Sequence, residues 1–496
     1  MRSGAGRLSG RPALVWFRND LRLADHPALT AACASGAPLL CLYVQDEVSE
    51  GLRPRGAASR WRLDLALHEL EQDLRAIGGR LDILAGPAED LIVELARAAD
   101  VENIFWNRRY AGGEIALDTR LKARLREEGR NVTSFNGSLL AEPWRIKSKS
   151  GGAFKVFTPF WRSFRENLLL AAPLPAPKAI SAAEWPDKAP QPLPRAALRL
   201  APQRLDWARD FPDAAPGEKG AQQRLRHFVA QGLDNYGAMR DRLDVEGTSG
   251  LSAHLHFGEI SPRQIVAAIA ESGGAALPGP AAKPPADADK FLSEIGWREF
   301  NANLLYQNPH LHWVNFNKAF DAFPFRDDAA ALKAWQCGQT GYPVVDAAMR
   351  ELWQTGFMHN RARMITASFL TKHLLLDWRQ GESWFWDTLA DADIANNAGG
   401  WQWVAGCGAD AAPYFRIFNP VLQGEKFDPM GDYVRKFCPE LAALPSSLIQ
   451  KPWTAGAAIL AQYGVRLGQI YPLPIVEHDF ARRRALAALQ SLRDSG

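Results

Sequence analysis

Short apolar runs alternate with longer amphipathic stretches over residues 13–137 of the chain. The stretches at 59–77 and 115–128 carry apolar residues at the three- and four-residue spacing of one helix face. Alternating strand and helix patterns are typical of βαβ units, so the pattern predicts an α/β domain with a doubly wound parallel sheet. Its strands are expected at residues 13–17, 39–44, 81–85, 103–106 and 132–135.

The pattern becomes helical from about residue 220 onward. Residues 291–306, 342–355 and 360–377 each carry apolar side chains at helical spacing, and no strand-rich stretch lies between them. This second half of the chain is therefore predicted to be an all-α domain.

A change in composition separates the two patterns. From about 170 to 215 the chain is rich in Ala, Pro and Leu, which is typical of a long linker that lies on the surface. We therefore divide the chain into an α/β domain at 1–140, a linker at 141–220 and a helical domain at 221–496.

Bulk composition restricts the class of protein. The 496 residues are too many for one ordinary domain, and 47% hydrophobic with 23% charged residues is a globular composition. No apolar run is long enough to cross a bilayer, so we expect no membrane segment. The five cysteines are scattered without a CxxC pair, which disfavours a disulfide framework or a metal site and favours a reducing cytoplasm. A net charge of +3 is too small to indicate nucleic-acid binding, which would require a local basic patch.

The first candidate site is Tyr236 together with the segment GTSGLS at 247–252. Small hydroxyl side chains beside glycines let backbone N–H groups approach a phosphate closely. The same residue types also favour the start of a helix, so a simple helix cap is the alternative.

The second candidate site is FLSEIGWREF at 291–300. On a helix, Glu294, Trp297, Arg298 and Asn301 lie on one face, because their spacing is i, i+3, i+4 and i+7. An acid, an indole and a guanidinium on one face indicate a polar pocket with a stacking wall. An exposed Glu–Arg pair beside a packed tryptophan would produce the same pattern.

The third candidate site combines a helix at 356–369 with the segment 391–428. The second segment holds acids, adjacent asparagines and two tryptophans, with little helical or strand periodicity. Arg363 and Asp391 are the pair expected to form an ion pair. A desolvated pair of this kind is costly unless it is well hydrogen-bonded, so it usually indicates a ligand or a polar network.

Together these motifs resemble those of the DNA photolyase and cryptochrome family, and most closely the bacterial photolyases that repair cyclobutane pyrimidine dimers. The resemblance extends over nearly the whole chain. It implies an α/β domain followed by an all-α FAD-binding domain, with UV-damaged DNA as the partner of a monomer. It also implies light-driven repair by electron transfer from excited, reduced FAD to a dimer that is flipped out of the duplex.

The resemblance assigns one set of residues to the flavin. Asn397, rather than Asn396, matches the amide near the flavin ring when the count starts from Trp401, and an amide there can stabilise reduced flavin by donating a hydrogen bond. At position 250 this chain has Gly where relatives commonly have Arg. The implied cofactor-binding residues are Tyr236, Thr248, Ser249, Leu251, Ser252, Phe291, Arg298, Arg363, Asp391, Asp393 and Asn397.

A second set is assigned to the substrate. The matching glutamate, Glu294, contacts the dimer bases in relatives. Asn360 stands where enzymes that repair the (6-4) photoproduct have a second histidine, so the (6-4) lesion is disfavoured. The implied DNA-binding residues are Arg240, Trp297, Asn360, Arg361, Met364, Trp403, Arg416 and Lys426.

Tryptophans form the third set. Trp401 and Trp378 match the proximal and middle members of the chain of three that carries an electron to the flavin in many relatives. The distal position is Phe325, and phenylalanine is far harder to oxidise. Trp384 and Trp386 are a possible other exit.

Two alternatives stay open at this point. Phe325 favours a cryptochrome-like blue-light receptor without repair activity, whereas the set Glu294, Trp297, Met364 and Trp403 favours repair. The antenna chromophore is also open. No GxGxxG follows the first predicted strand, and NRRY at 107–110 is followed by Ala111 where folate-binding relatives often have Glu. A folate held differently, near residues 142–144, a deazaflavin, or no antenna are all compatible with the sequence.

Overall fold

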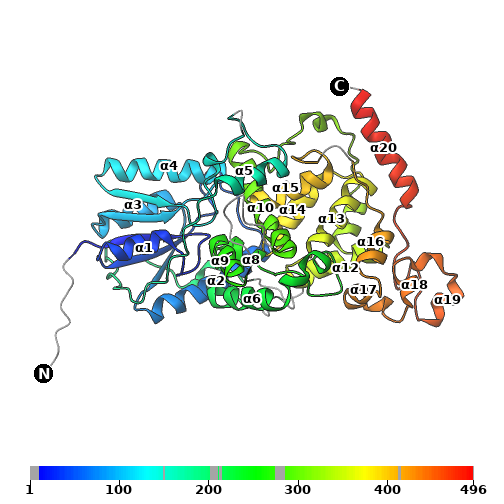
Figure 1. The fold of residues 1–496 in the computed structure, drawn as a ribbon, viewed down its shortest axis with the longest axis horizontal. Helices are drawn as coiled ribbons and strands as arrows, with labels where there is room; N and C mark the ends of the chain where they lie inside the picture. The colour runs from blue at the N-terminus through cyan, green and yellow to red at the C-terminus, as the bar shows by residue number, and fades with distance from the viewer. Residues whose placement is uncertain are drawn as a thin grey trace.

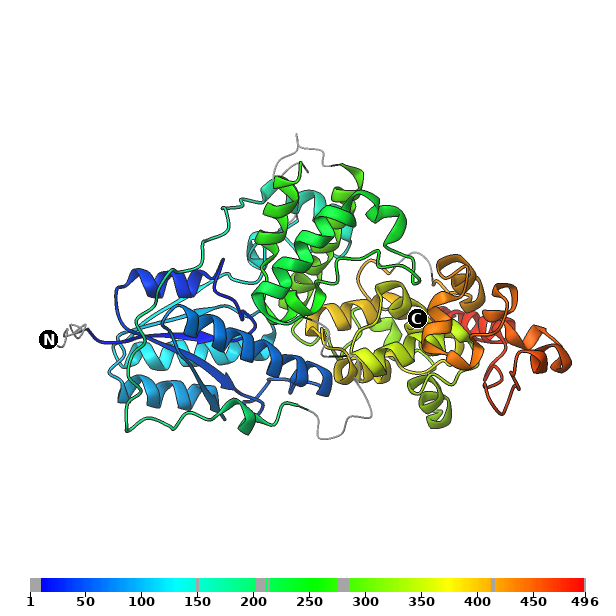
Figure 2. The same ribbon diagram turned by 90° about the horizontal axis from the view of Figure 1, so that it is seen from below.

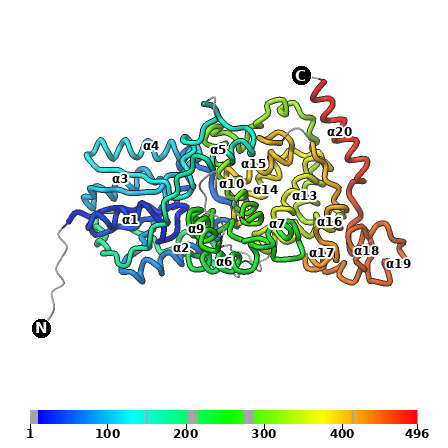
Figure 3. The backbone as a smooth tube through the Cα atoms, in the orientation of Figure 1, coloured from blue at the N-terminus to red at the C-terminus, as the bar shows by residue number. Residues whose placement is uncertain are grey.

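The computed structural model describes residues 10–148, 151–201, 211, 215–273, 285–411 and 415–494. An α/β half lies at one end of the molecule, and the remaining helices extend away from it (Figure 1). The C-terminal helix α20 (His478–Asp494) lies at the opposite end from α1 (Pro27–Ala34), as the tube view also shows (Figure 3).

The sheet has five parallel strands in the order β3-β2-β1-β4-β5. All five predicted strands are present within a residue of their expected ends. Their bounds are β1 (Ala13–Phe17), β2 (Leu39–Gln45), β3 (Leu81–Ala85), β4 (Asn103–Asn107) and β5 (Asn131–Phe135). The prediction of a doubly wound parallel sheet is therefore confirmed.

Helices cover both faces of this sheet, as the view from below shows (Figure 2). Alternate strand residues point to opposite faces. Val15 and its neighbours of the same parity pack on α1 and α2 (Ala57–Ala76), whereas Trp16 and its neighbours pack on α3 (Ala88–Ala98) and α4 (Gly112–Glu127). Because both faces are buried, the strands read as continuous apolar runs.

The strand order reverses direction between β1 and β4. In open α/β sheets, ligands bind beyond the carboxyl ends of the strands at this switch point. The segments that follow β1, β2 and β4 therefore form the edge of the sheet at which a ligand is expected.

The other half is helical throughout its described part, apart from a single isolated bridge between Leu467 and Tyr471. Two large apolar clusters form its core. Its α-helices are α5 (Phe157–Asn167), α6 (Gly217–Gln231), α7 (Tyr236–Met239), α8 (Ser252–Phe257), α9 (Pro262–Glu271), α10 (Ala286–Gln307), α11 (Ala329–Gln336), α12 (Pro343–Thr355), α13 (Asn360–Ser368), α14 (Trp378–Thr388), α15 (Ile394–Ala405), α16 (Pro420–Phe427), α17 (Asp432–Phe437), α18 (Ser446–Ile449), α19 (Ala457–Gln462) and α20.

Short 3-10 helices and one π-helical turn complete the secondary structure. They are η1 (Pro143–Arg145), η2 (Arg195–Leu198), η4 (Leu233–Asn235), η5 (Lys318–Ala322), η6 (Phe369–His373), η7 (Pro439–Leu441) and η8 (Pro452–Thr454), of which η6 is the π-helical turn. None of the helices in the described ranges is long and apolar enough to cross a membrane. The domain boundaries at residues 140 and 220 stay a prediction.

One predicted helix is wrong in its extent. Residues 360–377 were expected to form a single helix, but α13 ends at Ser368, continues as η6 and stops at His373. Leu375 has φ +55, a left-handed conformation that a helix cannot contain. The Asp377 side chain then accepts from the backbone N–H of Arg379 and caps the start of α14.

Two glycines allow the helices of the site to pack closely. A Cβ at Gly381 of α14 would lie 2.1 Å from Cη2 of Trp401 on α15. A Cβ at Gly399 of α15 would lie 2.5 Å from Oδ1 of Asn301 on α10. Because neither glycine has a side chain, α15 can pack closely against both α14 and α10.

Candidate functional site

One cavity of about 830 Å³ lies between the α/β half and the helical half, and residues of both halves line it. This volume is within the range of about 300–1,000 Å³ that is usual for cofactor and ligand sites. Helices α10, α13 and α15 contribute much of the helical wall, and segments that follow β1, β2 and β4 contribute the α/β wall.

The predicted face of α10 does point into this cavity. The Trp297 ring stacks on Phe157 with centroids 4.0 Å apart and an interplanar angle of 7°. Arg298 donates from Nη1 to the backbone oxygen of Ser138 at 2.8 Å, which attaches α10 to the segment after β5. Glu294 forms an ion pair with Arg240 at the same wall. At these residues the structure therefore has a pocket wall and not an exposed helix face.

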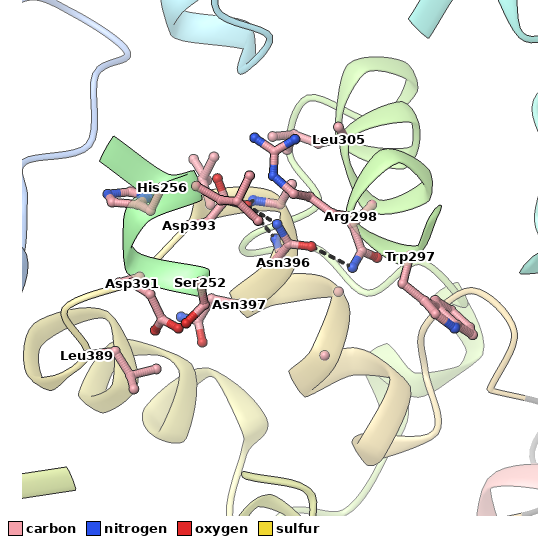
Figure 4. A pocket seen from close by; sticks show the side chains of 18 of the residues that line it. Ser252, His256, Trp297, Arg298, Leu305, Leu389, Asp391, Asp393, Asn396 and Asn397 are labelled. Atoms are coloured by element: carbon pink, nitrogen blue, oxygen red, sulfur yellow. Dashed lines mark hydrogen bonds between the residues drawn. The ribbon is translucent and has the colours of Figure 1, made fainter. Parts of the chain in front are cut away.

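The expected ion pair between Arg363 and Asp391 is present. Nη2 of Arg363 donates to both carboxylate oxygens of Asp391, at 3.0 and 2.8 Å. Burial alone would raise the pKa of Asp391, but the charge and hydrogen bonds of Arg363, with a further hydrogen bond from Ser252, hold this pKa below its ordinary value. Figure 4 shows the Asp391 carboxylate directed toward Ser252. The cavity therefore contains a carboxylate that stays ionised although its side chain is only 5% exposed.

Asp393 determines where α15 begins. Its side chain accepts from the backbone N–H groups of Ala395 and Asn396, as a helix N-cap does. The same oxygen accepts from Nδ2 of Asn396 at 2.7 Å, and Nδ2 of Asn301 donates to the oxygen of Asn396 at 3.0 Å (Figure 4). Both polar atoms of the Asn396 side chain therefore have a partner in the protein.

Asn397 has a different set of partners. Its Nδ2 donates to the carboxylate Oε1 of Glu382 at 2.9 Å and to the backbone oxygen of Glu382 at 3.0 Å. The amide oxygen is then the polar atom that Asn397 offers to the cavity. In this orientation the N–H group is engaged by Glu382, and the expected hydrogen bond from the amide to a flavin ring stays a prediction.

The segment 247–252 lies against α10 and α7. Tyr236 and Phe291 pack edge to face with centroids 5.2 Å apart, and both line the cavity with Thr248 to Ser252. Burial raises the pKa of Tyr236, so its hydroxyl stays protonated. Gly250 has φ +60, and a Cβ there would lie 2.4 Å from Nη1 of Arg224. Arg224 of α6 thus occupies the space beside the position where relatives commonly have arginine.

A basic and aromatic rim surrounds another part of the cavity. Arg361 donates to Asp241 at 2.7 Å and lies over the Phe427 ring at 4.5 Å. The guanidinium of Arg416 lies 5.5 Å from the ring centroid of Trp403. Trp403 itself faces the cavity, so an aromatic ring and exposed positive charge lie together on this side.

Most of the predicted site residues line this one cavity. Trp378, Arg416 and Lys426 do not: Trp378 is fully buried, and the other two side chains are exposed outside it. The functional roles of all of them stay predictions. Those that line the cavity are Tyr236, Arg240, Thr248, Ser249, Leu251, Ser252, Phe291, Glu294, Trp297, Arg298, Asn360, Arg361, Arg363, Met364, Asp391, Asp393, Asn397, Trp401 and Trp403.

The tryptophans singled out in the sequence lie on α14 and α15 and make separate contacts. Trp401 packs edge to face on Phe385 at 4.9 Å, and Trp378 donates from Nε1 to Asn315 at 2.8 Å. Trp384, the neighbour of Phe385 on α14, stacks on Trp353 with centroids 5.7 Å apart and planes only 1° from parallel. Trp353 is 38% exposed, so this stack extends to the surface.

The cavity continues to the switch point of the sheet. Trp16, Gln45 and Arg109 line it there, next to the carboxyl ends of their strands. Nε1 of Trp16, Oε1 of Gln45 and Nε of Arg109 are buried without a hydrogen-bond partner among the described residues, whereas the terminal nitrogens of Arg109 form ion pairs with Glu114 and Asp118. Buried polar atoms are normally paired, so these atoms indicate a place for a ligand.

Sequence reasoning missed several residues of the site. Glu382, Arg53 and His256 are among them, and the Glu382 side chain reaches the site through its hydrogen bond with Asn397. Arg53 and His256 carried no local signal, because their partners lie far away in the sequence. Burial and the charge of Arg55 lower the pKa of His256 to about 4, so this cavity-lining imidazole is neutral.

Two family models match the chain. One, described as the FAD binding domain of DNA photolyase, matches residues 291–491, and the other, described as DNA photolyase, matches residues 13–178.

Individual proteins agree with these models. A deoxyribodipyrimidine photo-lyase of Agrobacterium fabrum is 48% identical over 488 residues, which is 98% of this chain and 99% of that protein. Cryptochrome-1 of Arabidopsis thaliana is 37% identical over 495 residues, which is 99% of this chain and 71% of that protein. The crystal structure of a bacterial class III photolyase from Agrobacterium tumefaciens superposes with a TM-score of 0.91 at 46% identity, and the match covers 99% of this chain and 100% of that one.

Proposed function

The chain belongs to the DNA photolyase family, and from this premise we propose that it is a deoxyribodipyrimidine photo-lyase that repairs cyclobutane pyrimidine dimers with blue light. The main support for the proposal is that two sets of residues line the same cavity. An ionised Arg363–Asp391 pair suits a cofactor, and Trp297 and Trp403 offer aromatic walls to a base.

The cavity residues fit FAD. A buried ion pair, a loop of small hydroxyl residues at 248–252 and the amide oxygen of Asn397 together provide charge, hydrogen-bond donors and an acceptor around one volume. Nε1 of Trp401 is buried without a partner among the described residues, which leaves a donor at the same wall. When bound, reduced FAD would supply the light absorption and the electron that opens the cyclobutane ring.

The protein's own residues bind and orient the dimer. Flipping a dimer into a pocket costs a few kcal/mol of unstacking, and aromatic stacking in the pocket offsets this cost. We assign this stacking to Trp297 and Trp403, and we propose that Met364 and Asn360, which line the same cavity, also contact the dimer. Glu294 would hydrogen-bond the bases. Arg240 pairs with Oε1 of this carboxylate, which leaves Oε2 as an acceptor for a base.

Basic residues at the cavity wall and beside it would bind the DNA backbone. Arg240, Arg361 and Arg416, together with Lys426, lie around or beside the cavity, and each phosphate contact adds affinity that falls with salt. We propose that the protein acts on UV-damaged DNA as a monomer in the cytoplasm, where its free cysteines remain reduced.

An antenna chromophore fits the part of the cavity at the switch point of the sheet. The buried atoms of Trp16 and Gln45 that lack a hydrogen-bond partner among the described residues support this position. The alternative place near residues 142–144 is less suitable, because Glu142 already accepts from Arg108 and from the Tyr110 hydroxyl at 2.8 Å. We therefore propose an antenna, a folate or a deazaflavin, at the strand ends.

The test is a repair assay on chemically reduced protein. We expect blue light, and not darkness, to restore intact thymines in an oligonucleotide that carries one thymine cyclobutane dimer. Trp297→Leu should weaken binding of this oligonucleotide about tenfold or more, since stacking contributes about 1–3 kcal/mol per base. Trp185→Phe is the matched control, because Trp185 packs against the α/β core away from the cavity.

Two results would contradict the proposal. Protein that contains reduced FAD and restores no thymines would instead favour a cryptochrome-like receptor. Repair of an oligonucleotide with a (6-4) photoproduct, and not of the dimer, would show that the pocket is assigned to the wrong lesion.

A further inference from the structure

We infer that Arg53, a residue of the α/β half, is a positioning residue for Asn397: it holds Glu382, and Glu382 holds the amide of Asn397 with its oxygen toward the cavity. The inference rests on the proposed function in one respect, which is that a flavin ring lies at this amide. We refer to Arg53, Glu382 and Asn397 as the relay.

The first contact of the relay is a bidentate ion pair. Nη1 and Nη2 of Arg53 donate to Oε1 and Oε2 of Glu382 at 2.7 and 2.8 Å. The two side chains are 14% and 4% exposed. A planar guanidinium matches both oxygens of a carboxylate at once, so this geometry fixes the direction of the carboxylate as well as its charge.

The second contact fixes the amide of Asn397. Both hydrogen bonds of its Nδ2 go to Glu382, one to the carboxylate and one to the backbone oxygen. An ionised carboxylate can only accept hydrogen bonds. Rotating the amide by 180° would place its oxygen against these two acceptors. The carboxylate therefore selects one of the two orientations of the amide.

The selected orientation has a consequence for the flavin. An oxygen that faces the ring edge could accept from the N–H group that the central flavin ring gains on reduction and that oxidised flavin lacks. A hydrogen bond made only to one redox form stabilises that form. The relay should therefore raise the reduction potential of the bound flavin.

Arg53 is itself held against α14 by several contacts. Its guanidinium lies 4.0 Å from the ring centroid of Trp386, and Nε1 of Trp386 donates to the backbone oxygen of Pro54 at 2.8 Å. The N–H group of Ala57 donates to Asp387 at 2.9 Å. A Cβ at Gly56 would lie 2.0 Å from the backbone oxygen of Trp386, so this segment approaches the helix too closely for any side chain there. The α/β half thus presents Arg53 to Glu382 in one defined position.

The experiment measures the reduction potential of bound FAD in four proteins: the wild type, Arg53→Met, Glu382→Gln and the double variant. We expect Arg53→Met to shift the equilibrium about tenfold toward oxidised flavin, which is about 30 mV for a two-electron couple. In the Glu382→Gln background the same change should have little further effect, because the relay is already broken. Arg53→Lys keeps the charge but not the bidentate geometry, and should show an intermediate shift.

The controls separate positioning from simple charge. Arg60→Met removes a positive charge of the same half that pairs with Glu47, a cavity-lining residue outside the relay, and should leave the potential unchanged. The inference is overturned if Arg53→Met has the wild-type potential, or if it lowers the potential equally with and without Glu382, as a direct charge effect would. The potential is measured without substrate. A failure of dimer repair, which would contradict the proposed function, is therefore distinguishable from a failure of the relay.

Discussion

Replacing Arg363 with methionine should destabilise the protein strongly, because it leaves the Asp391 carboxylate buried without its partner. Methionine keeps the length of the side chain and the helix propensity of α13. The two N–O distances of 3.0 and 2.8 Å correspond to a Coulomb attraction of about 6 kcal/mol at an effective dielectric constant of about 20. Removing one member of a buried pair costs about 3–5 kcal/mol after desolvation is included. We expect a loss of this size in the free energy of unfolding.

Urea unfolding of the flavin-free protein is the assay, and two further variants make it specific. Arg363→Met combined with Asp391→Asn should recover much of the loss, since no unpaired charge is left. Arg379→Met removes the ion pair of Arg379 with Asp377, in which the two side chains are 35% and 30% exposed, and should cost about 1 kcal/mol or less.

The pH dependence has a defined sign. The pKa of Asp391 is lowered in the folded protein, so the pair stabilises the fold above the unfolded value of about 3.9 and this contribution is lost as the pH falls below it. In Arg363→Met the Asp391 carboxylate has lost its cation, so its protonation at low pH should increase the free energy of unfolding. The reasoning is wrong if Arg363→Met unfolds within about 1 kcal/mol of the wild type, or if the double variant is no more stable than the single one.

Three further predictions concern the surroundings of the cavity. Trp384→Phe and Trp353→Phe, each made alone, should slow the photoreduction of oxidised flavin by blue light, because the parallel stack of Trp384 and Trp353 offers electrons a path from the surface. Dimer repair by chemically reduced protein should not change. Gly381→Ala should cost about 1–3 kcal/mol in a urea series and slow photoreduction as well, since its Cβ would lie 2.1 Å from Trp401. Burial lowers the pKa of Lys372 to about 7, whereas an unfolded lysine titrates at about 10.4. Between these pH values the unfolded protein binds one proton more than the folded protein, so the free energy of unfolding should rise with pH. Lys372→Met should abolish that rise.

The sequence predicted the elements whose burial produces a periodic pattern. The strands β1 to β5 are buried on both faces and therefore stand out as apolar runs. Helical spacing placed Glu294, Trp297 and Arg298 on one face of α10, but that spacing fits an exposed face as well as a pocket wall, and only the family resemblance favoured the pocket. Similarity to known motifs added the choice of cavity-lining residues, which periodicity could not provide.

The rest depends on contacts between distant segments. Arg53 and Glu382 are 329 positions apart, and no pattern in either segment indicates the other. The Trp353–Trp384 stack likewise joins two helices that are separate in the sequence. The end of η6 near Leu375 depends on a single left-handed residue, for which leucine carries no signal.

The orientation of Asn397 shows why the site requires both halves of the molecule. An amide has an acceptor and a donor of similar size, so shape alone does not select which one faces the cavity. A carboxylate such as Glu382 selects the orientation, but a carboxylate that is only 4% exposed is costly without a cation. The structure provides that cation from a segment of the α/β half, which Gly56 allows to approach α14 closely. The choice of one atom at the cavity wall is therefore determined by the contact between the two halves, and weakening that contact should change the flavin before it changes the binding of DNA.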